Sequence, residues 1–121
     1  MAKGISNTSR TLEYLRSQGW ICDKVEQFNA YAGKFGQRKD LFGIIDIIAL
    51  GEHPGAIGIQ SCGQAFSEHD KKILDSPMSL KWLEKNNTLI LIGWRKILKK
   101  RGGKLKIWAP RIKRYSIEDF K

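Results

Sequence analysis

Residues 41–50 (LFGIIDIIAL) constrain the fold of this chain more than any other segment. They form an almost unbroken apolar run, which is typical of a central strand covered on both faces of a sheet. Asp46 interrupts this run. An unpaired carboxylate in an apolar layer costs several kcal/mol or takes up a proton, so Asp46 requires a partner. The run is too short for a bilayer, which needs about 20 apolar residues, and we expect no membrane anchor.

The other segments predict an α/β fold. A short amphipathic helix is predicted at 8–18, a half-exposed strand at 20–28 and a loop at 29–39. The 41–50 strand should form a hairpin with a second buried strand at 56–62. Residues 67–86 predict one broken helix or two short helices, with Ser76 as a cap before Pro77. A buried strand is predicted at 88–94 and an exposed edge strand at 104–108.

These elements predict one domain over residues 1–121. Its architecture would be a central mixed β-sheet flanked by helices, in the order α-β-β-β-α-β, followed by a basic hairpin and tail. We place the core at about 8–94 and the basic C-terminal extension at 95–121.

Positive charge is concentrated at the C-terminal end. The chain has 22 Lys and Arg against 12 Asp and Glu, a formal net charge of +10. Residues 1–80 carry equal numbers of both signs, so residues 81–121 hold the entire surplus. Such a region attracts polyanions and releases their counterions, which predicts nucleic acid as the partner. The alternative is charge that only keeps a solvated face soluble.

The spacing of the basic residues supports a nucleic-acid surface. Lys and Arg alternate with Trp108 between Trp94 and Tyr115, which suits phosphate contacts beside a stacking or wedge surface, and residues 101–104 (RGGK) predict a charged hairpin turn. The basic residues of the 29–39 loop could reach the same ligand. The candidate nucleic-acid-binding residues are Lys34, Arg38, Lys39, Arg95, Lys99, Lys100, Arg101, Lys104, Arg111, Lys113 and Arg114.

Strand alternation suggests a partner for Asp46. It would share one face of its strand with the even-numbered residues of 42–48, and Gln60 would lie on one face of the next strand. If the hairpin register sets these faces together, Asp46 and Gln60 become neighbours. Glu13 and Glu26 are additional acids that could converge there. Oxygen ligands on rigid elements are what Mg²⁺ needs, with waters and a substrate phosphate completing its octahedron.

The chain resembles the PD-(D/E)XK nuclease superfamily over about residues 8–94. The resemblance is carried by the element order, by Glu13 in the first helix, by Asp46 in FGIID, and by Gln60 and Cys62 in IQSC. Within the superfamily the sequence is similar to small Holliday-junction-resolvase-like enzymes and their phage-encoded relatives. The resemblance implies a restriction-endonuclease-like core and a site made of Glu13, Asp46, Gln60 and Cys62.

The resemblance also implies roles for these residues. Glu13, Asp46 and Gln60 would bind Mg²⁺ or Mn²⁺, although an amide at the glutamate position removes a negative charge and weakens metal binding. Cys62 occupies the position of the lysine and supplies no ammonium to stabilise charge on the phosphate. Four lysines could substitute from other elements: Lys34, Lys39, Lys71 and Lys72.

Together these features predict a cytoplasmic, metal-dependent endonuclease acting on DNA. The resemblance further implies branched DNA as a substrate and a homodimer, whose two symmetric sites would match a two-fold substrate. Three alternatives stay open. The chain could be a catalytically impaired nuclease-fold protein that only binds nucleic acid, or an interaction protein whose charge is incidental. Asp46 could also be a buried residue that only accepts hydrogen bonds. The N-terminal residues contain no apolar signal core, so we expect Cys22 and Cys62 to be reduced.

Overall fold

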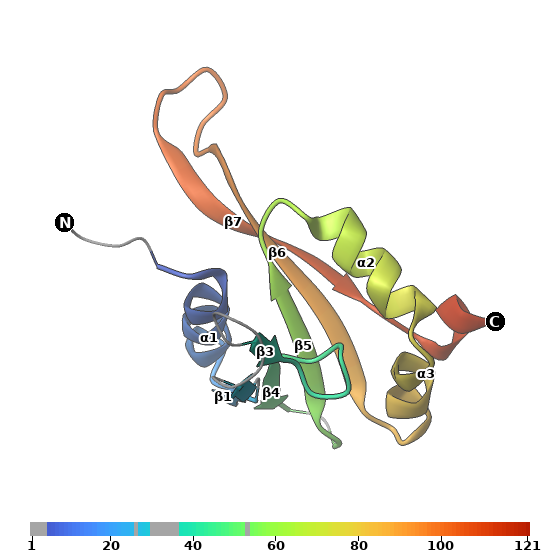
Figure 1. The fold of residues 1–121 in the computed structure, drawn as a ribbon. Coiled ribbons are helices and arrows are strands. Elements are labelled where there is room, and N and C mark those ends of the chain that lie inside the picture. The colour runs from blue at the N-terminus through green and yellow to red at the C-terminus, as the bar shows by residue number, and fades with distance from the viewer. Residues whose placement is uncertain (1–4, 26, 30–36, 53) are drawn as a thin grey trace.

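The computed structural model describes residues 5–25, 27–29, 37–52 and 54–121. Figure 1 shows a mixed sheet with α1 on one face and α2 and α3 on the other. The five strands of the sheet lie in the order β1-β4-β5-β6-β7, and β2 and β3 form a separate two-stranded ribbon. The predicted α/β class with a central mixed sheet flanked by helices is confirmed.

The first helix, α1 (Asn7–Ser17), begins at Ser6, whose side chain accepts a hydrogen bond from the amide of Ser9. Thr11 and Leu15, one turn apart, are its buried residues, as expected of a helix with one face on a sheet. Strand β1 (Ile21–Lys24) follows and pairs antiparallel with β4 (Ile47–Leu50). The helix and strand predicted at 8–18 and 20–28 are thus confirmed in outline, but β1 is shorter than expected.

The segment predicted as a loop at 29–39 is corrected in part. Strand β2 (Gln27–Asn29) pairs antiparallel with β3 (Gln37–Lys39), so both ends of the segment belong to a β-ribbon. Residues 30–36, including the candidate Lys34, lie outside the described part of the chain. The same holds for Glu26 and for the side chain of Arg38.

The continuous strand predicted at 41–50 is wrong for its first half. Phe42 and Gly43 have φ angles of +55° and +77°, and the amides of Ile44 and Ile45 both donate to the carbonyl of Leu41. This tight turn reverses the chain before β4 begins, because left-handed backbone ends a strand and glycine adopts it readily. Asp46 therefore lies at the entrance of β4 and not in the middle of a long strand.

The second half of the sheet follows the sequence pattern closely. Strand β5 (Ile57–Cys62) pairs antiparallel with β4 and is buried along its whole length. Helices α2 (Phe66–Asp75) and α3 (Pro77–Glu84) then cross the sheet, and Ser76 caps α3 before Pro77. Strand β6 (Thr88–Leu98) returns parallel to β5, as a helical crossover requires.

Strand β7 (Lys106–Arg114) forms the edge of the sheet, and its hairpin with β6 extends beyond the body of the molecule (Figure 1). We call residues 95–108 of this hairpin the arm. The predicted turn at 101–104 is confirmed, and both strands of the hairpin run longer than the sequence suggested. A 3₁₀ turn, η1 (Ile117–Phe120), ends the chain with the capping box of Ser116 and Asp119.

The core consists of two apolar clusters, one on each face of the sheet. Leu15 of α1 packs against Ile47, Ile59 and Ile92 on one face. Ile73 of α2 belongs to the cluster on the other face, with residues of α3, β6 and the C-terminal turn. Within the described ranges no helix is long and apolar enough to cross a membrane.

Candidate functional site

Asp46 lies at the point where β4 and β5 begin to pair. Its backbone amide donates to the carbonyl of Ile59, and its side chain is 4% exposed. The backbone amide of Ser61 donates to both carboxylate oxygens, at 3.2 Å to Oδ1 and 3.1 Å to Oδ2. A backbone amide aimed at a carboxylate favours its charged form and fixes its orientation.

Gln60 is the second member of this site, and the prediction that it neighbours Asp46 is confirmed. Its Nε2 donates to Asp46 Oδ2 at 3.2 Å. Its Oε1 is buried and, among the described residues, is the one side-chain polar atom of this kind without a hydrogen-bond partner. A buried carbonyl oxygen left unpaired costs about 1–3 kcal/mol, so a ligand that coordinates this atom would recover that free energy.

The residues present fit a small divalent cation. Mg²⁺ in proteins is commonly held by one or two carboxylates together with waters and substrate phosphates. Asp46 would contribute the anionic oxygen and Gln60 Oε1 the neutral one, from two adjacent strands of a rigid sheet. In the part of the chain that the structure describes, this site included, no three His, Cys, Asp or Glu side chains gather in a way that could hold a metal ion, so any cation here would rely on Asp46, Gln60 and waters.

The structure does not bring Glu13 to this site, so the predicted convergence is corrected. Glu13 is exposed, because Thr11 and Leu15 occupy the face of α1 that meets the sheet and a residue two positions away points elsewhere. Thr11 takes the position facing β5. Its Oγ1 lies 2.7 Å from Ser61 Oγ and accepts a hydrogen bond from Trp94 Nε1 at 2.8 Å.

This Thr11–Ser61–Trp94 network is a feature that the sequence analysis missed. It connects α1 to β5 and β6 and holds the residue whose amide binds Asp46. A signal existed, because Thr11 lies four residues before Leu15 on one helical face. The spacing places Thr11 on the buried face of the helix, but it does not predict which polar groups the hydroxyl contacts.

Cys62 follows Gln60 on the same face of β5 and is 4% exposed. Burial, together with the smaller effect of the Asp46 charge, raises the pKa of its thiol to about 11, although Arg111 and Lys72 act in the opposite direction. The side chain is therefore a neutral thiol near pH 7. It provides neither the positive charge of a lysine nor the thiolate that nucleophilic or metal-binding cysteines require.

Two cations act electrostatically on Cys62, Lys72 on α2 and Arg111 on β7. Lys72 Nζ lies 3.8 Å from a carboxylate oxygen of Asp40, the residue that follows β3. Lys72 is thus the one among the four candidate replacement lysines that is brought toward this face. Lys39, Lys71 and Lys72 are all exposed, and Lys34 falls outside the described ranges.

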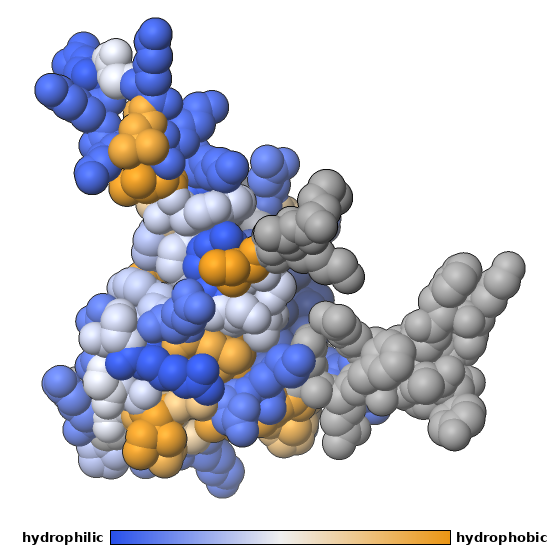
Figure 2. Space-filling view, turned by 90° about the vertical axis from the view of Figure 1, so that its left-hand side faces the viewer, coloured by the Kyte–Doolittle hydropathy of each residue, from blue (hydrophilic) through white to orange (hydrophobic). Residues whose placement is uncertain are grey.

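The basic candidates divide into two groups. Those of the arm are exposed and surround apolar side chains, which Figure 2 shows as an orange patch among blue basic residues. The exposed candidates are Arg95, Lys99, Lys100, Arg101, Lys104, Arg111 and Arg114. Lys113 is different, because it donates to Asp70 Oδ1 at 2.8 Å and is half-buried, so its charge is already used within the fold.

Trp108, expected as a stacking surface, is engaged by cations of the chain itself. The guanidinium carbon of Arg10 on α1 lies 4.0 Å from the centroid of its ring, and Lys96 Nζ lies 5.2 Å from it. Arg10 also lies 5.9 Å from the ring of Trp94. These cation–π contacts connect the base of the arm to α1 and cover part of the indole that a nucleobase would use.

Comparisons with known proteins leave the site to be interpreted from its own chemistry. No family model, curated protein or solved structure matches this chain.

Proposed function

We propose that this chain is a metal-dependent endonuclease-like protein that hydrolyses phosphodiesters in DNA, with Asp46 and Gln60 as the metal-binding residues. The observation that carries the proposal is the buried Gln60 Oε1, which has no partner among the described residues and belongs to a side chain hydrogen-bonded to a buried carboxylate. Oxygen ligands with one negative charge suit Mg²⁺ or Mn²⁺ rather than a softer metal.

The connectivity of the sheet supports a restriction-endonuclease-like core. Helix α1 is followed by β1, β4 and β5, which pair antiparallel in sequence order apart from the β2–β3 ribbon. The α2–α3 crossover then leads to β6, parallel to β5. This agrees with the α-β-β-β-α-β order that the resemblance to the PD-(D/E)XK superfamily implies.

The residues of the site would divide the work as follows. A bound divalent cation would supply an activated water and neutralise charge on the phosphate. Asp46 would hold the cation while the amide of Ser61 keeps the carboxylate oriented, and Gln60 would add a neutral ligand. Lys72 would supply positive charge from α2, because Cys62 carries none.

Cleavage assays test the proposal directly. Purified protein would be incubated with branched, duplex and single-stranded DNA, each with Mg²⁺ or Mn²⁺. We expect metal-dependent cleavage that an Asp46→Asn substitution abolishes. Asp75→Asn is a matched control, since it removes the same charge from an exposed residue at the end of α2. Equal activity of the wild-type protein and Asp46→Asn would overturn the proposal.

A second candidate function is nucleic-acid binding without cleavage. The neutral Cys62 thiol favours it, and so does the fact that Asp46 is the one carboxylate that the described residues bring to the site, because both weaken the chemistry of hydrolysis. It predicts binding that needs no metal and weakens steeply with salt, through the exposed cations of the arm. Retention of DNA binding by Asp46→Asn, with no cleavage by either protein, would select this candidate.

A homodimer and a cytoplasmic location complete the proposal. Two symmetric sites would match a two-fold nucleic-acid substrate, which is the reason small resolvase-like proteins pair. Both cysteines are free and buried, which agrees with a reducing compartment. Sedimentation with and without branched DNA would measure the oligomeric state, and a monomer under both conditions would remove the dimer from the proposal.

A further inference from the structure

A hollow of about 240 Å³ lies where the base of the β6–β7 hairpin faces the start of α2. Its lining includes Gly63 and Phe66 from the α2 side, and Gly93, Arg95 and Arg111 from the two strands. The lining holds two arginines and no acidic residue. The volume is below the roughly 300–1,000 Å³ of pockets that enclose drug-sized ligands, so a small anionic group fits better than a whole nucleotide.

The backbone register explains why both arginines face this hollow. Gly93 pairs with Arg111 and Arg95 pairs with Ala109, so the two arginines are diagonal neighbours on one face of antiparallel strands. Gly93 also pairs with Cys62 on its other side. Cys62, Gly93 and Arg111 therefore form a row across three strands, on the face that carries Gln60.

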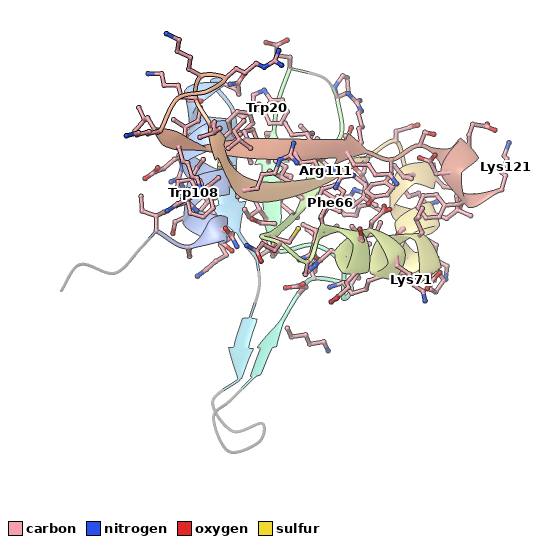
Figure 3. The ribbon with its side chains drawn as sticks, turned by 90° about the horizontal axis from the view of Figure 1, so that it is seen from above. Trp20, Phe66, Lys71, Trp108, Arg111 and Lys121 are labelled. Atoms are coloured by element: carbon pink, nitrogen blue, oxygen red, sulfur yellow. The ribbon has the colours of Figure 1, made fainter. Side chains whose placement is uncertain are left out.

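Arg111 is held in place without using its hydrogen-bond donors. Its guanidinium carbon lies 4.1 Å from the centroid of the Phe66 ring, and Figure 3 shows the two side chains together. A guanidinium stacked on a ring by its face keeps the N–H groups of its edge available, and this fork matches the oxygens of a phosphate. Outside the backbone pairing of β6 and β7, the side chains of Arg111 and Arg95 make no hydrogen bond or ion pair with any residue that the structure describes.

The acid Asp70 interacts electrostatically with Arg111 but accepts no hydrogen bond from either arginine. Asp70 on α2 accepts hydrogen bonds from Lys113 Nζ at 2.8 Å and Tyr115 Oη at 2.6 Å. Its side chain is therefore occupied by partners further along β7 and its end. The positive charge of Arg95 and Arg111 remains directed at the hollow.

We propose that Arg95 and Arg111 form a phosphate subsite, which holds a backbone phosphate of a nucleic-acid strand beside the Asp46–Gln60 site. The subsite deepens the proposed function and rests on it for the identity of the polymer. It separates two roles within the basic surface: the arm beyond Arg95 attracts the polyanion through exposed charge, and this hollow, which takes Arg95 from the base of the arm, fixes one phosphate in register with the site. Such positioning requires phosphate-binding residues on the same sheet face as the Asp46–Gln60 site, where Arg111 lies.

Titration with inorganic phosphate tests the subsite without DNA or metal. In heteronuclear NMR spectra we expect saturable shifts of the amide signals of Gly63, Gly93 and Arg111. The double variant Arg95→Gln/Arg111→Gln should lose these shifts. The matched control Lys99→Gln/Lys100→Gln removes the same charge from the arm and should keep them. Shifts confined to residues 96–108, or unchanged in the arginine variant, would overturn the subsite.

DNA binding supplies the second readout. We expect Arg95→Gln/Arg111→Gln to weaken affinity for an oligonucleotide by about tenfold or more, and beyond the effect of the lysine control. Arg111→Lys, which keeps the charge but loses the planar stack on Phe66, should fall between them. Equal losses in the two double variants would reject the subsite while leaving nucleic-acid binding intact. Phosphate shifts in a protein that binds no DNA would instead keep the subsite and reject the proposed function.

Discussion

Gln60 donates a hydrogen bond from Nε2 to Asp46 Oδ2 at 3.2 Å and leaves its own Oε1 buried without a partner in the described structure. The side-chain amide of Gln60 thus gives the carboxylate a hydrogen-bond donor, while its own carbonyl oxygen accepts none. In the absence of a cation this arrangement avoids placing two carboxylates side by side. The same neutrality limits how strongly the pair can attract a divalent metal.

Replacing Gln60 with Glu should lower the stability of the metal-free protein and raise its affinity for a divalent metal. Two carboxylates in contact raise the pKa of one of them, so without metal the variant should melt below the wild-type protein at pH 7 and recover as the pH falls. Added Mg²⁺ or Mn²⁺ should raise its melting temperature more than that of the wild-type protein. Thermal melts with and without metal measure both effects.

Gln64→Glu is the matched control for this substitution, because it adds the same charge at an exposed position. It should respond to metal as the wild-type protein does. If Gln60→Glu and Gln64→Glu respond equally, the cation does not bind between β4 and β5.

The Cys62 thiol should react with alkylating reagents only when the protein unfolds. Burial raises its pKa to about 11, and Cys22 is likewise buried with a raised pKa. Since the thiolate is the reactive form, alkylation by iodoacetamide at pH 7 should be slow in the native protein and fast in denaturant. Mass spectrometry of both cysteines follows the reaction. Rapid native labelling of Cys62 would show that the end of β5 opens to solvent.

The sequence predicted the parts of this fold that rest on hydrophobic periodicity. The buried strand at 56–62, the Ser76 cap before Pro77 and the hairpin turn at 101–104 all follow from local chemistry and are confirmed. The 41–50 run misled because every residue of it except Asp46 and Gly43 is apolar, whereas a turn at Phe42 and Gly43 depends on φ angles that hydrophobicity does not reveal.

The candidate site was predictable in the same uneven way. Asp46 and Gln60 were found together because adjacent strands of a hairpin fix their distance. Glu13 was misplaced because the rotation of a helix about its axis depends on which of its residues pack against the sheet. In α1 these residues are Thr11 and Leu15, so Glu13 points away from the sheet. The Arg111–Phe66 contact joins residues 45 positions apart, at a distance that local patterns do not report.

Asp70 should make stability depend on pH in the acidic range. Burial disfavours its charged form, but hydrogen bonds from Lys113 and Tyr115 outweigh that effect, so the pKa of Asp70 is lowered. Because the folded pKa lies below the unfolded value of about 3.9, the contribution is fully present above that pH and is lost as the pH falls through the folded pKa.

Asp70→Asn should therefore destabilise the protein at pH 7 by about 1–2 kcal/mol, as expected for loss of a charge-assisted hydrogen bond at a partly buried site. The difference from the wild-type protein should shrink below about pH 4. Urea denaturation at both pH values measures it. Asp75→Asn on the same helix is the control and should show little pH-dependent difference, and a gap for Asp70→Asn that is independent of pH would contradict the assigned role of its charge.

The Thr11 hydroxyl should contribute more to the free energy of unfolding than a polar side chain in a short helix usually does. Its hydroxyl contacts Ser61 Oγ at 2.7 Å and accepts from Trp94 Nε1 at 2.8 Å, and the side chain is fully buried. Thr11→Val keeps the shape but leaves two buried polar groups without this partner, which costs about 1–3 kcal/mol. Thr8→Val, on the same helix but only half-buried, should cost far less.

Because Ser61 also holds Asp46, Thr11→Val should speed hydrogen exchange of the Ser61 amide, measured by NMR, whereas Thr8→Val should not. If the two variants lose equal stability and exchange alike, the network does not anchor α1 to the site.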